Sequence, residues 1–178
     1  MRLYHYVGPA AIRRRVEGHA VGRVVTTPAD VLAWIRESGQ ERDHEGLVSS
    51  TFVIDAEGRL RIEDYGSEHV ACAGGGPVRS AGVAWFAATD RGLVVARITN
   101  ESTGFCPEPE SWPAVESALD TAGIAHPGGF ERPRIFRRCP ACGQRNVVKD
   151  GWFHCAVCDA RLPSRWNFAK SGPEEAAG

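Results

Sequence analysis

The chain of 178 residues has no run of about 18 apolar residues, the length that a helix needs to cross a membrane. Its N-terminus, MRLYHYVGPAAIRRR, lacks an apolar signal core, so we expect that the protein is not exported. The phosphate-binding fingerprints GxGxxG and GxxxxGKS/T are missing, and so are internal repeats and low-complexity blocks. These absences argue against membrane proteins, repeat proteins and the nucleotide-binding folds that carry those fingerprints.

The chain has six cysteines, and only two of them lie outside its two CxxC pairs. This spacing suits a metal site in a reducing compartment better than a disulfide framework, and we expect a cytoplasmic protein. Hydrophobic residues make up 43% of the chain and charged residues 24%, a composition typical of globular proteins. The length allows one full-sized domain and a small appendage.

Hydrophobic periodicity predicts an α+β fold, with two or three helices and an antiparallel sheet filling residues 1–131. Alternating residues predict a strand at 2–7, a hairpin over 47–64 and a second strand pair between 82 and 99. Capping residues and apolar stripes predict helices near 9–18, 27–39 and 111–123. After a Pro/Gly linker at 126–133, we expect a small basic module over 132–170 and a disordered tail over 171–178.

The basic module contains the sequence CPAC at 139–142 and CAVC at 155–158. Two CxxC turns joined by a hairpin can bring four thiolates around one tetrahedral ion, so we predict that Cys139, Cys142, Cys155 and Cys158 bind Zn²⁺. Iron in a rubredoxin-like site is the alternative. His154 is a poorer candidate ligand, because it adjoins Cys155. Residues 136–166 resemble the zinc-ribbon class, which implies a structural metal and a surface that binds protein or nucleic acid.

Charge is distributed unevenly between the two predicted parts. Residues 1–131 carry 12 Lys/Arg and 18 Asp/Glu, whereas residues 132–170 carry 9 and 2. The basic module either contacts a polyanion or docks on the acidic domain. Its basic and aromatic side chains interleave, as in surfaces that hold phosphates and stack bases. The alternative is that the aromatics form the module's own core and the arginines its solvated rim. The residues concerned are Arg134, Phe136, Arg137, Arg138, Arg145, Lys149, Trp152, Phe153, Arg161, Arg165 and Trp166.

Two loops in the middle of the chain, 67–82 and 100–112, contain the remaining chemistry-bearing residues. His69, Cys72, Cys106 and Glu108 are the candidate catalytic residues, because a thiol beside an imidazole is a potential nucleophile. The same residues can instead be structural, as buried apolar thiols and a hydrogen-bonded histidine. A second metal site formed by the histidine and the two cysteines is a weaker alternative.

The runs "STF", "HVACAGGGPVRSAG" and "STGFCPEP" distantly resemble a module of plant IQ-motif calmodulin-binding proteins and bacterial toxin-like proteins. The resemblance spans 49–112 and implies a shared fold more than a shared function. The matching positions are His69, Gly75, Ala81, Gly82, Ser102, Phe105 and Pro107. Gly104 stands where that module has a second histidine, for which Cys106 could substitute.

Two functions follow. The leading prediction is a cytoplasmic zinc-ribbon protein that binds a protein or a nucleic acid. The alternative is an enzyme that uses the 67–110 loops, either a thiol or imidazole transferase or an ADP-ribosyltransferase-like protein with a toxin-related role. The sequence does not indicate the oligomeric state.

Overall fold

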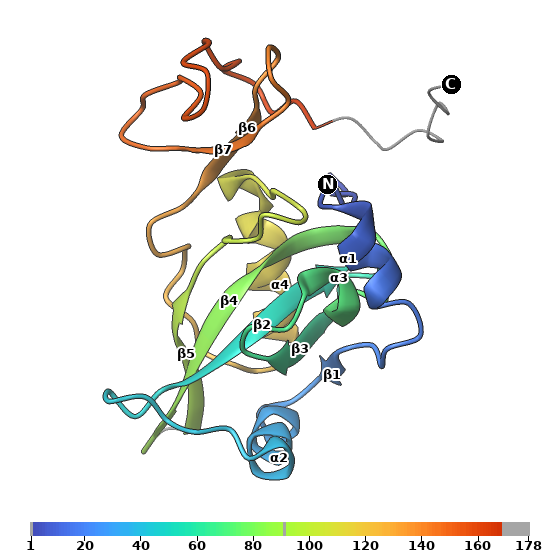
Figure 1. The fold of residues 1–178 in the computed structure, drawn as a ribbon. Coiled ribbons are helices and arrows are strands. Elements are labelled where there is room, and N and C mark those ends of the chain that lie inside the picture. Colours follow the sequence, from blue (N-terminus) through green and yellow to red (C-terminus); the bar gives the residue numbers. More distant parts are fainter. Residues whose placement is uncertain (1, 91, 169–178) are drawn as a thin grey trace.

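The computed structural model describes residues 2–90 and 92–168, and it confirms the α+β fold (Figure 1). Its larger sheet has five strands in the order β1-β3-β2-β4-β5, and all neighbours pair antiparallel. The strands are β1 (Arg23–Val25), β2 (Val48–Asp55), β3 (Leu60–Asp64), β4 (Val78–Thr89) and β5 (Gly92–Ile98). The helices are α1 (Ala10–Arg15), α2 (Pro28–Ser38), α3 (His69–Cys72) and α4 (Trp112–Thr121), with a 3-10 turn at Pro109–Ser111. Both predicted hairpins are confirmed as β2–β3 and β4–β5.

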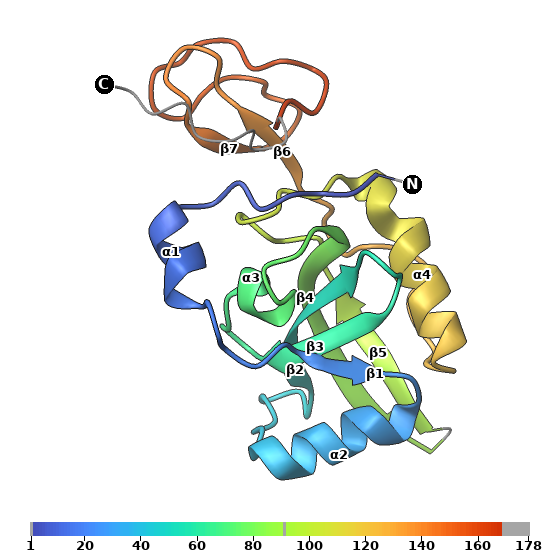
Figure 2. The same ribbon diagram turned by 90° about the vertical axis from the view of Figure 1, so that its right-hand side faces the viewer.

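Helices cover both faces of this sheet, so its central strands are buried on both sides. Side chains alternate along β2, where Val48, Phe52 and Ile54 join the core beneath α2 and α4, and Val53 joins the core on the other face. In Figure 2, α4 lies on the side of the sheet opposite α1 and α3. The second face is closed by Tyr4, Tyr6 and Phe105 rather than by a long helix.

Local signals explain why α2 was predictable. Asp30 lies in its first turn and accepts hydrogen bonds from the backbone N–H groups of Thr26 and Thr27, both at 2.8 Å. The N–H and hydroxyl of Thr26 are the main reason that the pKa of Asp30 falls to about 2. The helix ends at Gly39, whose φ of 64° is left-handed.

The predicted strand at 2–7 is wrong. Only Tyr4 pairs with the sheet, through an isolated bridge in which its N–H donates to Val78 O at 2.7 Å. Beyond it the chain diverges, and the N–H of Val7 donates to Gly104 O instead. The short elements β1 and α3 were not predicted, because three or four residues carry too little periodicity.

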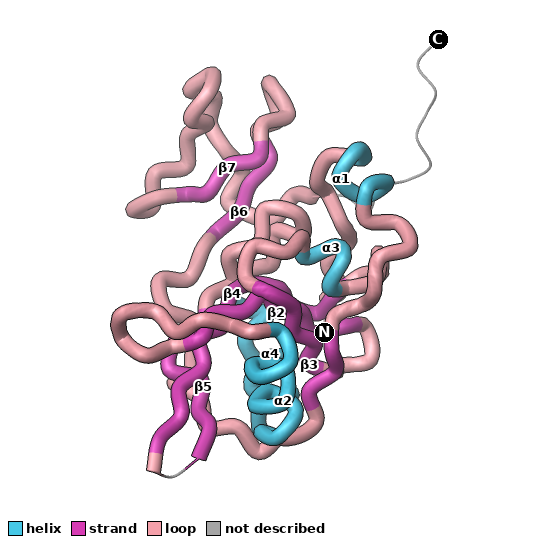
Figure 3. The backbone as a smooth tube through the Cα atoms, turned by 60° about the horizontal axis from the view of Figure 1, so that its bottom comes forward, coloured by secondary structure: helices cyan, strands magenta, loops and turns pink. Residues whose placement is uncertain are grey.

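The C-terminal module has little regular structure. Strands β6 (Ile135–Arg138) and β7 (Arg145–Val148) form a two-stranded antiparallel sheet, and Figure 3 shows them as short segments among loops. The boundary between residues 131 and 132 remains a prediction, and the predicted tail at 171–178 lies outside the described residues. No helix in the described part of the chain is long and apolar enough to span a membrane.

Candidate metal centre

The four predicted cysteines converge on one point. Their Sγ atoms all lie within 4.8 Å of one another, with Cys139 and Cys158 at 3.5 Å and Cys142 and Cys155 at 3.6 Å. A tetrahedral ion with bonds of about 2.3 Å to sulfur requires sulfur pairs about 3.8 Å apart. A disulfide would require about 2.05 Å, and none of the six cysteines is disulfide-bonded. The four side chains are therefore arranged to bind one metal ion.

Two turns of the same design present these ligands. In the first, the N–H of Gly143 donates to Cys139 O and the N–H of Cys139 donates to Gln144 O, at 2.9 and 2.8 Å. In the second, Asp159 donates to Cys155 O and Cys155 donates to Ala160 O, both at 2.9 Å. The residue after each second cysteine is left-handed, with φ of 74° at Gly143 and 57° at Asp159. Glycine adopts this conformation freely, whereas Asp159 adopts it at some cost.

Backbone N–H groups favour the thiolate, the form that binds metal, at each sulfur. At Cys142 the N–H of Gln144 acts in this direction, but the neighbouring thiols and burial raise the pKa to about 12, and the pKa of Cys158 is also raised. The N–H of Cys142 is the main influence that lowers the pKa of Cys139. Burial raises the pKa of Cys155, but the N–H groups of Cys158 and Val157, together with the side chains of Cys142 and Asn146, outweigh it and bring the value to about 6. Asn146 also supports the second turn: its Nδ2 lies 3.6 Å from Cys155 Sγ, and its Oδ1 accepts the N–H of Ala156.

His154 does not contribute to the cluster. Its Nδ1 lies 2.9 Å from Asp159 O, and its ring stacks on that of Trp152 with centroids 4.5 Å apart. With four sulfur ligands in place, a tetrahedral ion has no open position for water or substrate. The cluster therefore suits a structural metal that organises the module.

A buried ion pair joins this module to the larger sheet. Arg137 of β6 donates from Nη1 to Glu108 Oε1 at 2.7 Å, and the two side chains are only 5% and 12% exposed. The same guanidinium also donates to the carbonyls of Phe136, Pro163 and Ser164. Glu108, predicted as catalytic, is thus one half of the contact that attaches the module.

Further side chains at this junction pair across it. Asn100 donates to Pro107 O and Arg134 O and accepts the N–H of Arg134. Arg145 donates to Thr103 O at 2.6 Å, and the indole N–H of Trp166 donates to Cys106 O at 2.8 Å. The sequence left open whether the basic residues contact a polyanion or the acidic domain, and Arg134, Arg137 and Arg145 contact the larger domain. No local signal marks Asn100.

The other predicted catalytic residues lie in separate surroundings. Cys72 packs with Tyr4, Val53 and Phe105, whereas Cys106 packs with Phe136 and Phe168. Burial raises the pKa of each thiol to about 12, as expected of apolar core residues. Among the described residues, the ligand atoms close enough to share a metal are those of the four ribbon cysteines, so the second metal site is not formed.

His69, at the start of α3, has its Nε2 2.9 Å from Gly82 O. Burial lowers its pKa, and the bond to the carbonyl offsets this in part. This contact links two positions of the resemblance noted above. Gly104, at the position of the missing histidine, is in close contact with Tyr6: a Cβ there would lie 2.7 Å from Tyr6 Cε2. A histidine at this position would require Tyr6 to move.

Comparisons with protein-family models, with curated proteins and with solved structures found no match. The resemblance of residues 49–112 to the plant and toxin-like modules gains no support from them. The roles of His69, Cys72 and Cys106 in catalysis therefore remain predictions.

Proposed function

We propose that this chain is a zinc-ribbon binding protein. Zn²⁺ on Cys139, Cys142, Cys155 and Cys158 would fold the ribbon, and one face of the ribbon would contact single-stranded nucleic acid. The separation of the four sulfur atoms, which suits a tetrahedral ion, is the observation that carries this proposal. The free thiols also suit a reducing compartment, and we infer a cytoplasmic location.

The proposed contact face, the ribbon tip, consists of Lys149, Trp152, His154 and Arg161. Lys149 bridges Trp152 and His154 bridges Arg161, both antiparallel. Residues in such pairs point to the same side, as do residues two apart on one strand, so the four side chains share a face. Trp152 is 66% exposed although it stacks on His154. An exposed aromatic stack between two cations is suited to stack a base and hold its phosphates.

The arrangement of the side chains at the ribbon tip supports this proposal better than the total charge of the ribbon does. Over residues 132–168, the exposed cations are Arg132, Arg138, Lys149, Arg161 and Arg165, and the exposed carboxylates are Asp150 and Asp159. Zn²⁺ with four thiolates adds a formal charge of about −2, which leaves these exposed groups and the metal site together with a net charge of only about +1. We therefore expect weak, salt-sensitive binding that depends on the ribbon tip.

Fluorescence anisotropy with a labelled single-stranded RNA of about twelve nucleotides tests the proposal. Trp152→Ala should weaken binding by about 1–3 kcal/mol, because it removes the stacking surface. Lys149→Ala should reduce the slope of log K against log salt by about 0.7, the value for one phosphate contact on a single strand.

Two variants of the larger domain serve as matched controls. Tyr65 is 62% exposed and Arg36 is exposed on α2. Tyr65→Ala and Arg36→Ala should leave RNA binding unchanged. If the zinc-loaded protein binds no RNA or DNA at low salt, or if Trp152→Ala binds as well as the unaltered protein, the nucleic-acid proposal is wrong and a protein partner replaces it.

A further inference from the structure

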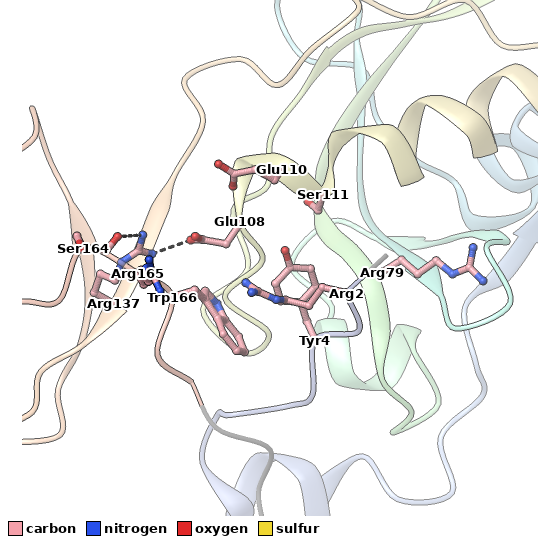
Figure 4. Close-up of a pocket in the computed structure, with 10 residues that line it drawn as sticks. All are labelled: Arg2, Tyr4, Arg79, Glu108, Glu110, Ser111, Arg137, Ser164, Arg165 and Trp166. Atoms are coloured by element: carbon pink, nitrogen blue, oxygen red, sulfur yellow. Dashed lines mark hydrogen bonds and ion pairs between the residues drawn. The ribbon is translucent and has the colours of Figure 1, made fainter.

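We propose that a cavity between the ribbon and the larger sheet binds a small oxyanion that carries several negative charges, such as a phosphorylated metabolite. This junction cavity has a volume of about 570 Å³, and residues from both parts of the chain line it (Figure 4). Arg137, Ser164, Arg165 and Trp166 come from the ribbon, and Arg2, Tyr4, Arg79, Glu108, Glu110 and Ser111 from the larger domain. This proposal does not depend on RNA binding by the ribbon tip.

The residues that line the junction cavity carry more positive than negative charge. Glu108 neutralises Arg137 through the buried ion pair, which leaves Glu110 as the one other carboxylate in the lining. Arg2, Arg79 and Arg165 form no ion pair with any described residue. Other exposed arginines, such as Arg36, also form no ion pair with a described residue, so this site is distinguished by having three of them around one cavity. An anionic ligand would supply the missing partner.

The arginines do not all face the cavity equally. Arg79 donates from Nε to Ala56 O, and in Figure 4 its guanidinium points away from the other residues. Arg2 lies over the ring of Trp166, 4.8 Å from its centroid. Arg2 and Arg165 are therefore the two cations that we assign to the ligand, and the planar guanidinium suits both phosphate and carboxylate oxygens.

Neutral donors complete the site. The Tyr4 hydroxyl points toward Ser111 in Figure 4, and Tyr4 is 2% exposed. The Tyr4 hydroxyl is protonated at neutral pH, as any tyrosine is, and burial raises its pKa further. Ser111 Oγ lies 2.9 Å from Ser80 Oγ, at the N-terminus of α4. The volume lies in the range of small-molecule sites, which run from about 300 to 1,000 Å³.

Isothermal titration of the zinc-loaded full chain with inorganic pyrophosphate, and separately with citrate, tests this site. We expect binding at one site per chain. Arg2→Glu and Arg165→Glu should each weaken it by at least about tenfold, since each reverses a charge at an exposed position. Tyr4→Phe, which removes only the hydroxyl, should weaken it less. Preference for pyrophosphate assigns the site to phosphates, and preference for citrate assigns it to carboxylates.

Arg36→Glu is the matched control, because Arg36 is an exposed arginine on α2 and does not line the junction cavity. It should leave anion binding unchanged, and thermal unfolding should confirm that all variants are folded. If neither anion binds at millimolar concentration, or if Arg2→Glu and Arg165→Glu bind as tightly as Arg36→Glu, the proposal is wrong. Trp152→Ala should retain anion binding, which separates this result from a failure of RNA binding.

Discussion

The ion pair between Glu108 and Arg137 should make a large contribution to stability, and Glu108→Gln tests it. Gln keeps an oxygen that can accept the hydrogen bond now measuring 2.7 Å, but it removes the negative charge. Three carbonyl oxygens still solvate the guanidinium, which then lies buried without a counter-charge. Breaking a buried pair in this way costs about 3 kcal/mol, the lower end of the usual range. For a chain of this size, that corresponds to a fall in Tm of roughly 6–12 °C.

The assay is thermal unfolding in zinc-containing buffer, with Glu45→Gln as the control. Glu45 also pairs with an arginine, Arg97, at 2.8 Å, but these side chains are 49% and 35% exposed. A surface pair contributes about 0–1 kcal/mol, so Glu45→Gln should lower Tm by at most about 4 °C. Replacing both Glu108 and Arg137 by Gln should be less damaging than replacing Glu108 alone. If Glu108→Gln is no more destabilising than Glu45→Gln, the buried pair does not hold the ribbon in place.

Three other outcomes are expected. Only glycine is unstrained at the left-handed positions 143 and 159. In competition with a chromophoric chelator, Asp159→Gly should therefore hold zinc at least as tightly as the unaltered chain, and Gly143→Ala should hold it less tightly. His69 has a lowered pKa in the folded protein, so below about pH 6.5 it takes up a proton more readily in the unfolded chain, and the free energy of unfolding falls as pH falls. His69→Gln should make the free energy of unfolding less dependent on pH in this range while the protein stays folded. Iodoacetamide should leave Cys72 and Cys106 unmodified in the folded protein at pH 8 by mass spectrometry, and rapid alkylation would favour the thiol-enzyme alternative.

The features that the sequence predicted correctly depend on residues close together in the chain. Each CxxC pair forms within one turn, and the spacing between the pairs leaves room for a single hairpin, so the convergence of the four cysteines was predictable. Helix α2 was predictable for the same reason, because Thr27, Asp30 and Gly39 define its ends locally.

The features that were missed depend on distant partners. Tyr4 and Tyr6, which alternate along residues 2–7, are both buried, but the alternation contained no information about which backbone would pair with them. Glu108 and Arg137 are 29 positions apart, and nothing in either segment specifies their contact. For the same reason, the sequence could not place His69, Cys72 and Cys106 relative to one another, and their packing emerged only from the folded chain.

Elemental analysis combined with X-ray absorption at the metal edge determines whether the four cysteines bind zinc. We expect one zinc ion per purified chain, with four sulfur neighbours at about 2.3 Å and no nitrogen or oxygen ligand. Iron in place of zinc would change the identity of the metal but not the ligands. A folded protein without metal, or one with a disulfide inside either CxxC pair, would contradict the account.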